Sequence, residues 1–198
     1  MNKVRSVTTI KDNKLSDELI AFAKLLYDKG FIAGANGNMS VKLDDKRFLV
    51  TASGVHKGLM GPDGLVVVDD TGKVCAGSKE PSSEIFAHLA IYKEVPQARA
   101  VIHAHAPWCT AVSLKKEYVE LSGLVEAEHL FPRVEMVPRL KPGSRELASY
   151  CGDAAKRGKV FILKGHGVVS WGCDLKEAFC LVEALENNIK IVAMSSHF

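Results

Sequence analysis

Apolar residues recur along this chain with two different periods, which together predict a mixture of helices and strands. Helical spacing follows Ser16-Asp17-Glu18, where a capping hydroxyl and acidic residues indicate a helix start, and Gly30 is placed to end that helix. Asp174 and Glu177 have the spacing of a capping box and precede another helix. Its apolar stripe consists of Ala178, Val182, Leu185, Ile189 and Val192.

Further elements are predicted between these two helices. Helices are expected after Pro81-Ser82-Ser83-Glu84 as far as Tyr92, over a short segment from Trp108, and from Ser144 to near Gly158. Short apolar runs between turn residues predict strands at Met39 to Leu43, Arg47 to Thr51, Leu65 to Val68, Ala100 to Pro107, Val134 to Val137, Val160 to Leu163 and Val168 to Trp171.

The order of these elements predicts the fold class. The chain has 198 residues, enough to bury a core, and it contains no internal repeat, linker or low-complexity segment. Helices and strands are mixed along it rather than segregated. We therefore expect a single α/β domain over residues 1–198, with a central, mainly antiparallel sheet flanked by helices.

Composition and charge exclude several classes of protein. Apolar residues make up 47% and charged residues 25%, and the net charge of +3 comes without a Lys/Arg block, so nucleic acid is not expected as a partner. No apolar run approaches the ~20 residues that span a bilayer, and Met1 to Ser6 lead into polar residues rather than a signal peptide. The five cysteines are scattered and form no CxxC pair, which favours reduced thiols in the cytoplasm.

Two histidines one residue apart interrupt the apolar run from Ala100 to Pro107. On a strand, residues i and i+2 point to the same side roughly 6.5–7 Å apart, so the rings of His103 and His105 can reach one metal ion. Core histidines with satisfied nitrogens are the alternative. Because the flanking residues are apolar, and buried imidazoles without partners are costly, the pair favours a metal.

A third histidine, His166, lies between two glycines directly after an apolar strand. Glycines allow a sharp turn and a close backbone approach, so this side chain is well placed for presentation at the end of the sheet. Three neutral imidazoles with an open position describe a catalytic rather than a structural zinc site. Manganese, cobalt and iron also suit imidazole ligands.

Other polar residues near predicted turns indicate an anion site. Ser82, Ser83 and Glu84 open a helix, where free N–H groups suit a phosphate, although simple capping explains the same residues. Asn38 and Ser53-Gly54 lie in turns with free donors, and ordinary turn chemistry is the alternative. Among the remaining histidines, His88 is interpreted as a packing or hydrogen-bonding residue, and surface or loop positions are expected for His56, His129 and His197.

Taken together, these motifs resemble the class II aldolase/adducin family, and within it the L-fuculose-phosphate aldolase branch. The resemblance covers nearly the whole chain in the same order. Five motifs match: Gly37-Asn38-Met39-Ser40, Thr51-Ala52-Ser53-Gly54, Pro81-Ser82-Ser83-Glu84, His103-Ala104-His105 and Gly165-His166-Gly167.

The resemblance implies a role for each motif. It implies a divalent metal, usually zinc, held by His103, His105 and His166, with Glu84 reaching the metal and serving as acid and base. It implies that the substrate phosphate is held by Asn38, Ser53, Gly54, Ser82 and Ser83. The implied reaction is cleavage of a ketose 1-phosphate to dihydroxyacetone phosphate and an aldehyde through a zinc-stabilised enediolate. The implied assembly is a cyclic homotetramer with active sites between subunits.

The sequence also departs from the family pattern. Family aldolases carry a tyrosine near the segment that matches Leu121 to Leu130, where this chain has none, Tyr118 lying slightly too early, and no tyrosine follows Tyr150. Either the proton donor to the departing aldehyde differs, or the reaction does.

Several other activities fit parts of the pattern. Methylthioribulose-1-phosphate dehydratases and tetronate-phosphate decarboxylases keep the histidines and the glutamate, so they are direct competitors. Ribulose-phosphate 4-epimerases carry aspartate at the position of Glu84 and a longer C-terminus. A non-enzymatic adducin-like binding domain predicts loss of the metal ligands, all of which are present, and a structural zinc protein leaves the anion-binding turns unexplained.

Overall fold

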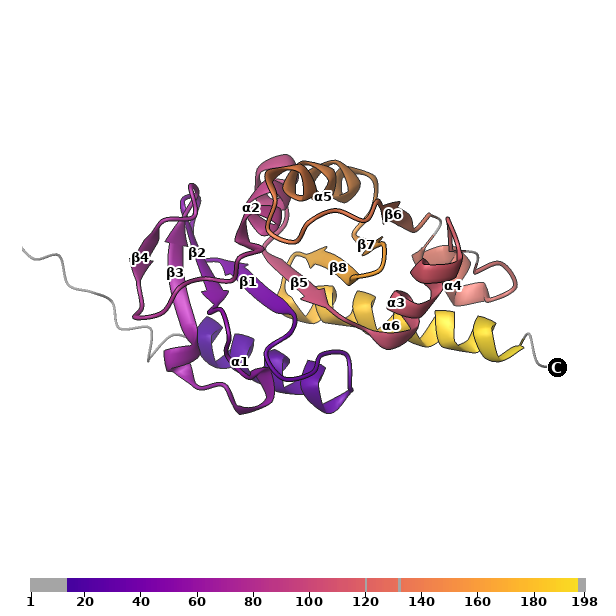
Figure 1. The fold of residues 1–198 in the computed structure, drawn as a ribbon, viewed down its shortest axis with the longest axis horizontal. Helices are drawn as coiled ribbons and strands as arrows, with labels where there is room; N and C mark the ends of the chain where they lie inside the picture. Colours follow the sequence, from indigo (N-terminus) through magenta and orange to yellow (C-terminus); the bar gives the residue numbers. More distant parts are fainter. Residues whose placement is uncertain (1–13, 120, 132, 196–198) are drawn as a thin grey trace, which may run out of the picture.

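A twisted sheet lies at the centre of the computed structural model, which describes residues 14–119, 121–131 and 133–195. In the described part, eight strands follow the order β4-β3-β2-β1-β5-β8-β7-β6 (Figure 1). All neighbouring strands pair antiparallel except β6 and β7, which are parallel, so the predicted mainly antiparallel sheet is confirmed. The strands are β1 (Asn38–Lys42), β2 (Arg47–Thr51), β3 (Leu65–Asp69), β4 (Val74–Ala76), β5 (Ala100–Ala104), β6 (Glu135–Val137), β7 (Val160–Leu163) and β8 (Gly167–Gly172).

Helices cover both faces of this sheet. The helices α1 (Lys14–Asp28) and α6 (Leu175–Ser195) share one apolar core with the sheet, and α2 (Ile85–Glu94) and α5 (Arg145–Arg157) share a second on the opposite face (Figure 1). The remaining helical segments are α3 (Pro107–Lys115), α4 (Val125–Leu130) and the 3₁₀ turns η2 (Lys57–Leu59) and η3 (Pro62–Gly64). The predicted α/β class with flanking helices is therefore confirmed.

The central strands are buried on both sides, which decides where their polar residues point. All five residues of β5 are buried. Ala100 and Ile102 contribute to the α1/α6 core, and Val101 contributes to the α2/α5 core. Because side chains alternate along a strand, His103 lies on the same face as Val101, beneath α2 and α5. A histidine at this position is enclosed by the fold.

Most predicted elements are present with shifted ends, but two predicted boundaries need correction and two short elements were not predicted. Strands β2 and β7 have the predicted bounds, but β5 ends at Ala104 rather than continuing to Pro107. The edge strand β4 and the helix α4 were not predicted, since both are short and partly exposed.

The start predicted for the first helix is also wrong. Helix α1 already includes Lys14, and Ser16 is a buried residue within it, whose hydroxyl has no hydrogen-bond partner among the described residues. The predicted end is confirmed, because Gly30 has a φ of 73° and donates its N–H to Tyr27 O at 2.9 Å.

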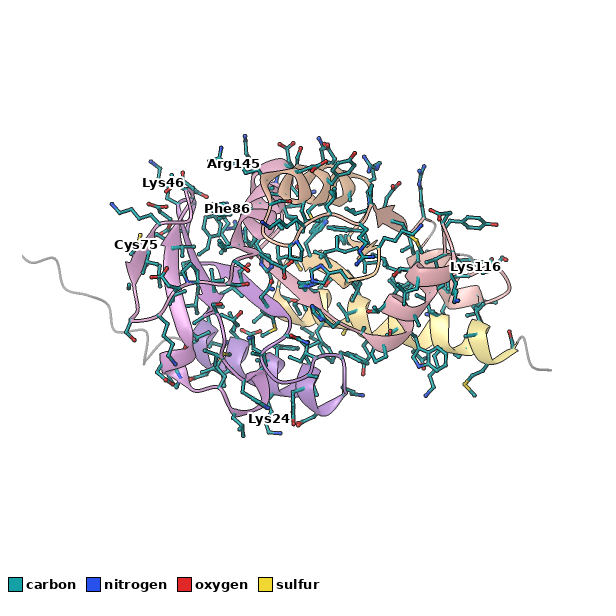
Figure 2. The ribbon with its side chains drawn as sticks, in the orientation of Figure 1. Lys24, Lys46, Cys75, Phe86, Lys116 and Arg145 are labelled. Carbon is teal, nitrogen blue, oxygen red and sulfur yellow. The ribbon has the colours of Figure 1, made fainter. Side chains whose placement is uncertain are left out.

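All five cysteines are free thiols, and Cys75 lies on the outer strand β4 (Figure 2). Within the described residues, no helix is both long and apolar enough to cross a membrane. Met1 to Ser6 and His197, for which expectations were stated above, lie outside the described residues.

Candidate metal centre

His103 lies near the end of β5, and its ring is held by the neighbouring strand β8. Nδ1 lies 3.0 Å from the carbonyl oxygen of Val168, which can only accept a hydrogen bond, so Nδ1 carries the proton. Nε2 then carries a lone pair, and this atom lies 3.1 Å from Nε2 of His105. Such a backbone contact orients a metal-binding imidazole and fixes its tautomer.

His105 follows the strand directly, in the corner that leads to α3. The backbone N–H groups of Trp108 and Cys109 both donate to the carboxylate of Glu186 at 2.8 Å. This buried carboxylate satisfies the first turn of α3 and complements the helix dipole. Glu186 therefore anchors the corner that presents His105, and sequence spacing gave no sign of that role.

His166 occupies the turn between β7 and β8, where the two predicted glycines have distinct roles. Gly165 has a φ of 68°, a conformation that other residues rarely adopt. A Cβ on Gly167 would lie 2.3 Å from the carbonyl oxygen of Ala104, so only glycine allows this approach to β5. The His166 ring centroid lies 4.6 Å from that of His103 and 4.9 Å from that of His105.

The three imidazoles form a donor set that fits a divalent cation. One ligand nitrogen from each of His103, His105 and His166 lies within 4.8 Å of the others. Burial, followed by the neighbouring rings, holds the pKa of His103 well below its ordinary value, and burial together with His166 lowers the pKa of His105. Neutral imidazoles are the form that binds metal. Tetrahedral zinc places its nitrogen ligands about 3.3 Å apart, close to the 3.1 Å between Nε2 of His103 and Nε2 of His105.

Glu84 contacts two of these histidines from the N-cap position of α2. It is the N-cap residue of the helix, yet its side chain caps no N–H group. Oε2 lies 3.4 Å from His103 Nε2, and Oε1 lies 3.7 Å from His166 Nε2. Instead, Ser82 Oγ accepts a hydrogen bond from the Glu84 backbone at 3.3 Å. The simple capping interpretation therefore applies to Ser82, and the carboxylate faces the imidazoles.

A buried hydrogen-bond chain fixes the Glu84 carboxylate. Asn38 Nδ2 donates to Glu84 Oε2 at 2.9 Å, so Asn38 Oδ1 accepts from His88 Nε2 at 2.6 Å. His88 Nδ1 then accepts from Ser40 Oγ at 2.7 Å, and Ser40 Oγ lies 2.9 Å from Tyr92 Oη. Burial lowers the pKa of His88 to about 3, so this ring is neutral at physiological pH. The expected hydrogen-bonding role of His88 is confirmed, and it supports Asn38.

A small cavity of about 160 Å³ opens beside the imidazoles. It brings together the residues that the sequence pointed to as an anion site, namely Asn38, Ser53, Gly54, Ser82 and Ser83, with Glu84, His105 and His166. The loop that ends in η2 also contributes Lys57, the first residue of that turn, which the sequence did not single out. His56 lies in that loop, half-buried against the Tyr27 ring, and His129 is exposed on α4. The lining of the cavity thus combines two imidazoles with several hydrogen-bond donors.

The chain of contacts behind Glu84 gives a first prediction. His88→Leu should lower the free energy of unfolding by about 2 kcal/mol or more, because Asn38 and Ser40 lose buried partners. It should also lower kcat while the metal stays bound, since the Asn38 amide becomes free to turn away from Glu84. Urea unfolding and steady-state kinetics measure the two effects. Tyr92→Phe, which removes only the far end of the chain, serves as the control, and equal stability of His88→Leu and the wild type would contradict the assignment.

Comparison with known proteins places this site in a family. The model for the class II aldolase and adducin N-terminal domain matches residues 17–193. A 3-oxo-tetronate 4-phosphate decarboxylase from Haemophilus influenzae is 35% identical over 178 residues, covering 87% of this chain and 84% of the relative. An L-fuculose phosphate aldolase from Methanococcus vannielii is 36% identical over 174 residues, covering 88% and 93%. The crystal structure of L-fuculose-1-phosphate aldolase from Thermus thermophilus superimposes with a TM-score of 0.83 at 26% identity, covering 92% and 94%.

The chain therefore belongs to the class II aldolase and adducin family. The relatives named above are enzymes, and this chain is an enzyme of the same class. Their names divide between an aldolase and a decarboxylase, so family membership leaves the particular reaction open.

Proposed function

We propose that this enzyme is a divalent-metal-dependent lyase that cleaves a ketose 1-phosphate, of the L-fuculose 1-phosphate type, to dihydroxyacetone phosphate and an aldehyde. The observation that supports this most is the cavity beside the three clustered imidazoles, which is lined by His105, His166 and Glu84 together with the donor-rich turns at Ser53-Gly54 and Ser82-Ser83. Cleavage of a phosphorylated sugar requires both the imidazole and carboxylate cluster and the donor-rich turns. The phosphate supplies binding and orientation, and the carbonyl end needs stabilisation of negative charge.

His103, His105 and His166 are the residues that would hold the metal, for which we propose zinc. When bound, such an ion supplies Lewis-acid stabilisation of the negative charge that develops beside the substrate carbonyl. The Val168 carbonyl and the corner anchored by Glu186 keep His103 and His105 in place. Preorganised ligands of this kind need no rearrangement during the reaction.

Glu84 is the proposed acid and base. Its carboxylate is buried, lies beside the imidazoles, and borders the cavity. Carbon–carbon cleavage requires a proton to leave the hydroxyl of the carbon that becomes the aldehyde, and a proton to reach the carbon left behind. We assign the second transfer to Glu84; no tyrosine is among the described residues that line this cavity to serve the first. Asn38 holds the carboxylate at the position where this transfer takes place.

Decarboxylation of a 3-oxo-tetronate 4-phosphate is the second candidate. It is favoured by the 35% identity with the Haemophilus relative and by the absence of the family tyrosine from the segment Leu121 to Leu130. Loss of carbon dioxide from a carboxylate requires no deprotonation. Release of an aldehyde, in contrast, requires that a hydroxyl group lose its proton. A site without that tyrosine lacks the family's group for the hydroxyl proton. Its absence therefore favours decarboxylation, which needs no such group, over aldol cleavage.

The proposal extends to assembly and location. Residues 1–198 form one domain, and the enzyme works in the cytoplasm as a homotetramer with sites between subunits. Large apolar side chains such as Leu59, Tyr118 and Val125 are 83%, 67% and 86% exposed, which suits burial against other copies. Light scattering coupled to gel filtration should give four times the chain mass of 21.5 kDa, and a monomer would contradict the assembly.

Product analysis distinguishes the candidate reactions. Metal-loaded enzyme is incubated separately with L-fuculose 1-phosphate, a 3-oxo-tetronate 4-phosphate and methylthioribulose 1-phosphate, and dihydroxyacetone phosphate, aldehyde and carbon dioxide are measured. Dihydroxyacetone phosphate with aldehyde supports the aldolase, and with carbon dioxide it supports the decarboxylase. Dehydration of methylthioribulose 1-phosphate without either cleavage would identify a dehydratase and reject both the aldolase and the decarboxylase. No turnover of any substrate would refute the proposed function.

A further inference from the structure

Lys57 is a buried lysine on the wall of the candidate active-site cavity. The residue is only 2% exposed, although lysine is almost never fully buried without a charged partner. Within residues 14–119, 121–131 and 133–195, no carboxylate forms an ion pair with it. It is also the only lysine or arginine among the described residues that line this cavity. A buried, unpaired cation therefore faces the same space as the imidazoles.

Two loops hold the lysine in this position. Nζ donates to the carbonyl oxygen of Val55 at 2.8 Å and to that of Ala35 at 3.2 Å. The backbone N–H of Lys57 donates to Gly34 O at 3.0 Å. An ammonium group has three N–H donors, and these contacts use two of them. No partner for the third donor is found among the described residues, so this donor and the positive charge are available to a ligand in the cavity that Lys57 lines.

The charge of Lys57 is present at neutral pH but is not neutralised by the fold. Burial lowers the pKa of Lys57 to about 8, so at pH 7 most molecules carry the ammonium form. Carbonyl dipoles satisfy hydrogen bonds without supplying a negative charge, and a buried ion without a counter-ion is costly. Glu84, the one carboxylate among the described residues that line the cavity, is engaged with Asn38 and the imidazoles. An anion bound in the cavity removes this cost.

We propose that Lys57 is a substrate-binding residue that supplies the positive charge for the substrate phosphate. The inference rests on the proposed function and deepens it, because it assigns a residue that selects phosphorylated substrates. The hydroxyl groups of Ser53, Ser82 and Ser83 and the N–H of Gly54, whose φ is 69°, border the same cavity. These neutral donors orient phosphate oxygens, and the lysine acts on them as a point charge.

A purely structural lysine, tying the loops at Ala35 and Val55 together, makes a different prediction. In that case its removal changes stability and leaves phosphate affinity unaltered. Lys57→Met keeps the length and apolar stem of the side chain and removes only the charge and donors. Lys42→Met is the matched control, since Lys42 is also largely covered, with 12% of its side chain exposed, and lies at the opposite end of β1 from Asn38.

The test is calorimetric titration of metal-loaded enzyme with inorganic phosphate at pH 7, together with steady-state kinetics on the sugar phosphate that the wild type accepts. Lys57→Met should weaken phosphate binding by about tenfold or more and raise KM by a similar factor, with kcat and metal content nearly unchanged. Lys42→Met should behave as the wild type. If Lys57→Met does not fold, Lys57→Gln, which keeps a donor for the carbonyls, is judged by the same measurements.

The outcomes separate this inference from the proposed function. Phosphate affinity of the folded variant within about twofold of the wild type would overturn the role of Lys57, even if the enzyme cleaves sugar phosphates normally. Failure of the wild type to bind phosphate would overturn it as well. Conversely, Lys57-dependent phosphate binding without turnover of any sugar phosphate supports the anion site and rejects the proposed reaction.

Discussion

The Glu84→Gln variant is expected to keep its metal and to lose about 10²–10⁴-fold in kcat, the range over which general acid–base catalysis contributes. The amide has nearly the shape of the carboxylate, so Asn38 and the fold around α2 should be retained. It cannot take up and return a proton at the reacting carbon. Metal analysis of the purified variant and steady-state kinetics on the accepted substrate give the two quantities.

Glu94→Gln is the matched control for that variant. Glu94 lies at the other end of the same helix and pairs with Lys156 on the surface, so its loss removes the same charge without touching the cavity. Its kcat should equal that of the wild type. Turnover by Glu84→Gln at the wild-type rate would show that another group transfers the proton.

Loss of a ring from the imidazole cluster should have a comparably large effect by a different route. His166→Ala is expected to lower metal content and to reduce kcat/KM about a thousandfold, because Lewis-acid stabilisation is worth several kcal/mol. The fold should survive, since His166 lies in a turn between β7 and β8 and is not part of either apolar core. Metal content by mass spectrometry and the unfolding midpoint separate a lost ligand from a lost fold.

His129→Ala controls for histidine removal in general. His129 is exposed on α4, and its replacement should leave metal content and turnover unchanged. Full metal occupancy and normal activity in His166→Ala would contradict the three-imidazole centre. A fall in the unfolding midpoint with metal retained would instead assign His166 a structural role.

Much of the fold could be predicted because its central strands form apolar runs with clear boundaries. β2 and β7 are buried and bounded by turn residues, so the periodic pattern located them. The edge strand β4 has three partly or fully exposed residues, and α4 has one buried residue among six, so neither carries a strong pattern. The sequence predicts a helix start at Ser16, whereas Ser16 lies within the first turn of α1. A serine followed by acidic residues is compatible with both positions.

The candidate site was predictable only where its residues are marked locally. His103 and His105 interrupt an apolar strand, and His166 stands between glycines, so each is visible in a few residues of sequence. The contact between Asn38 and His88 joins residues 50 apart in sequence and exists because β1 passes under α2. Lys57 gives no local signal, since nothing in its neighbourhood indicates that the chain buries it. Such residues become apparent only from tertiary contacts.

The central claim is that one divalent cation is shared by three imidazoles from two distant parts of the chain. Anomalous X-ray diffraction from crystals of the metal-loaded enzyme tests it most directly. We expect one strong peak per chain, about 2.0–2.1 Å from a nitrogen of each of His103, His105 and His166. A fully loaded enzyme whose peak lies elsewhere, for example at the exposed thiol of Cys75, or touches fewer than three of these rings, would contradict the account.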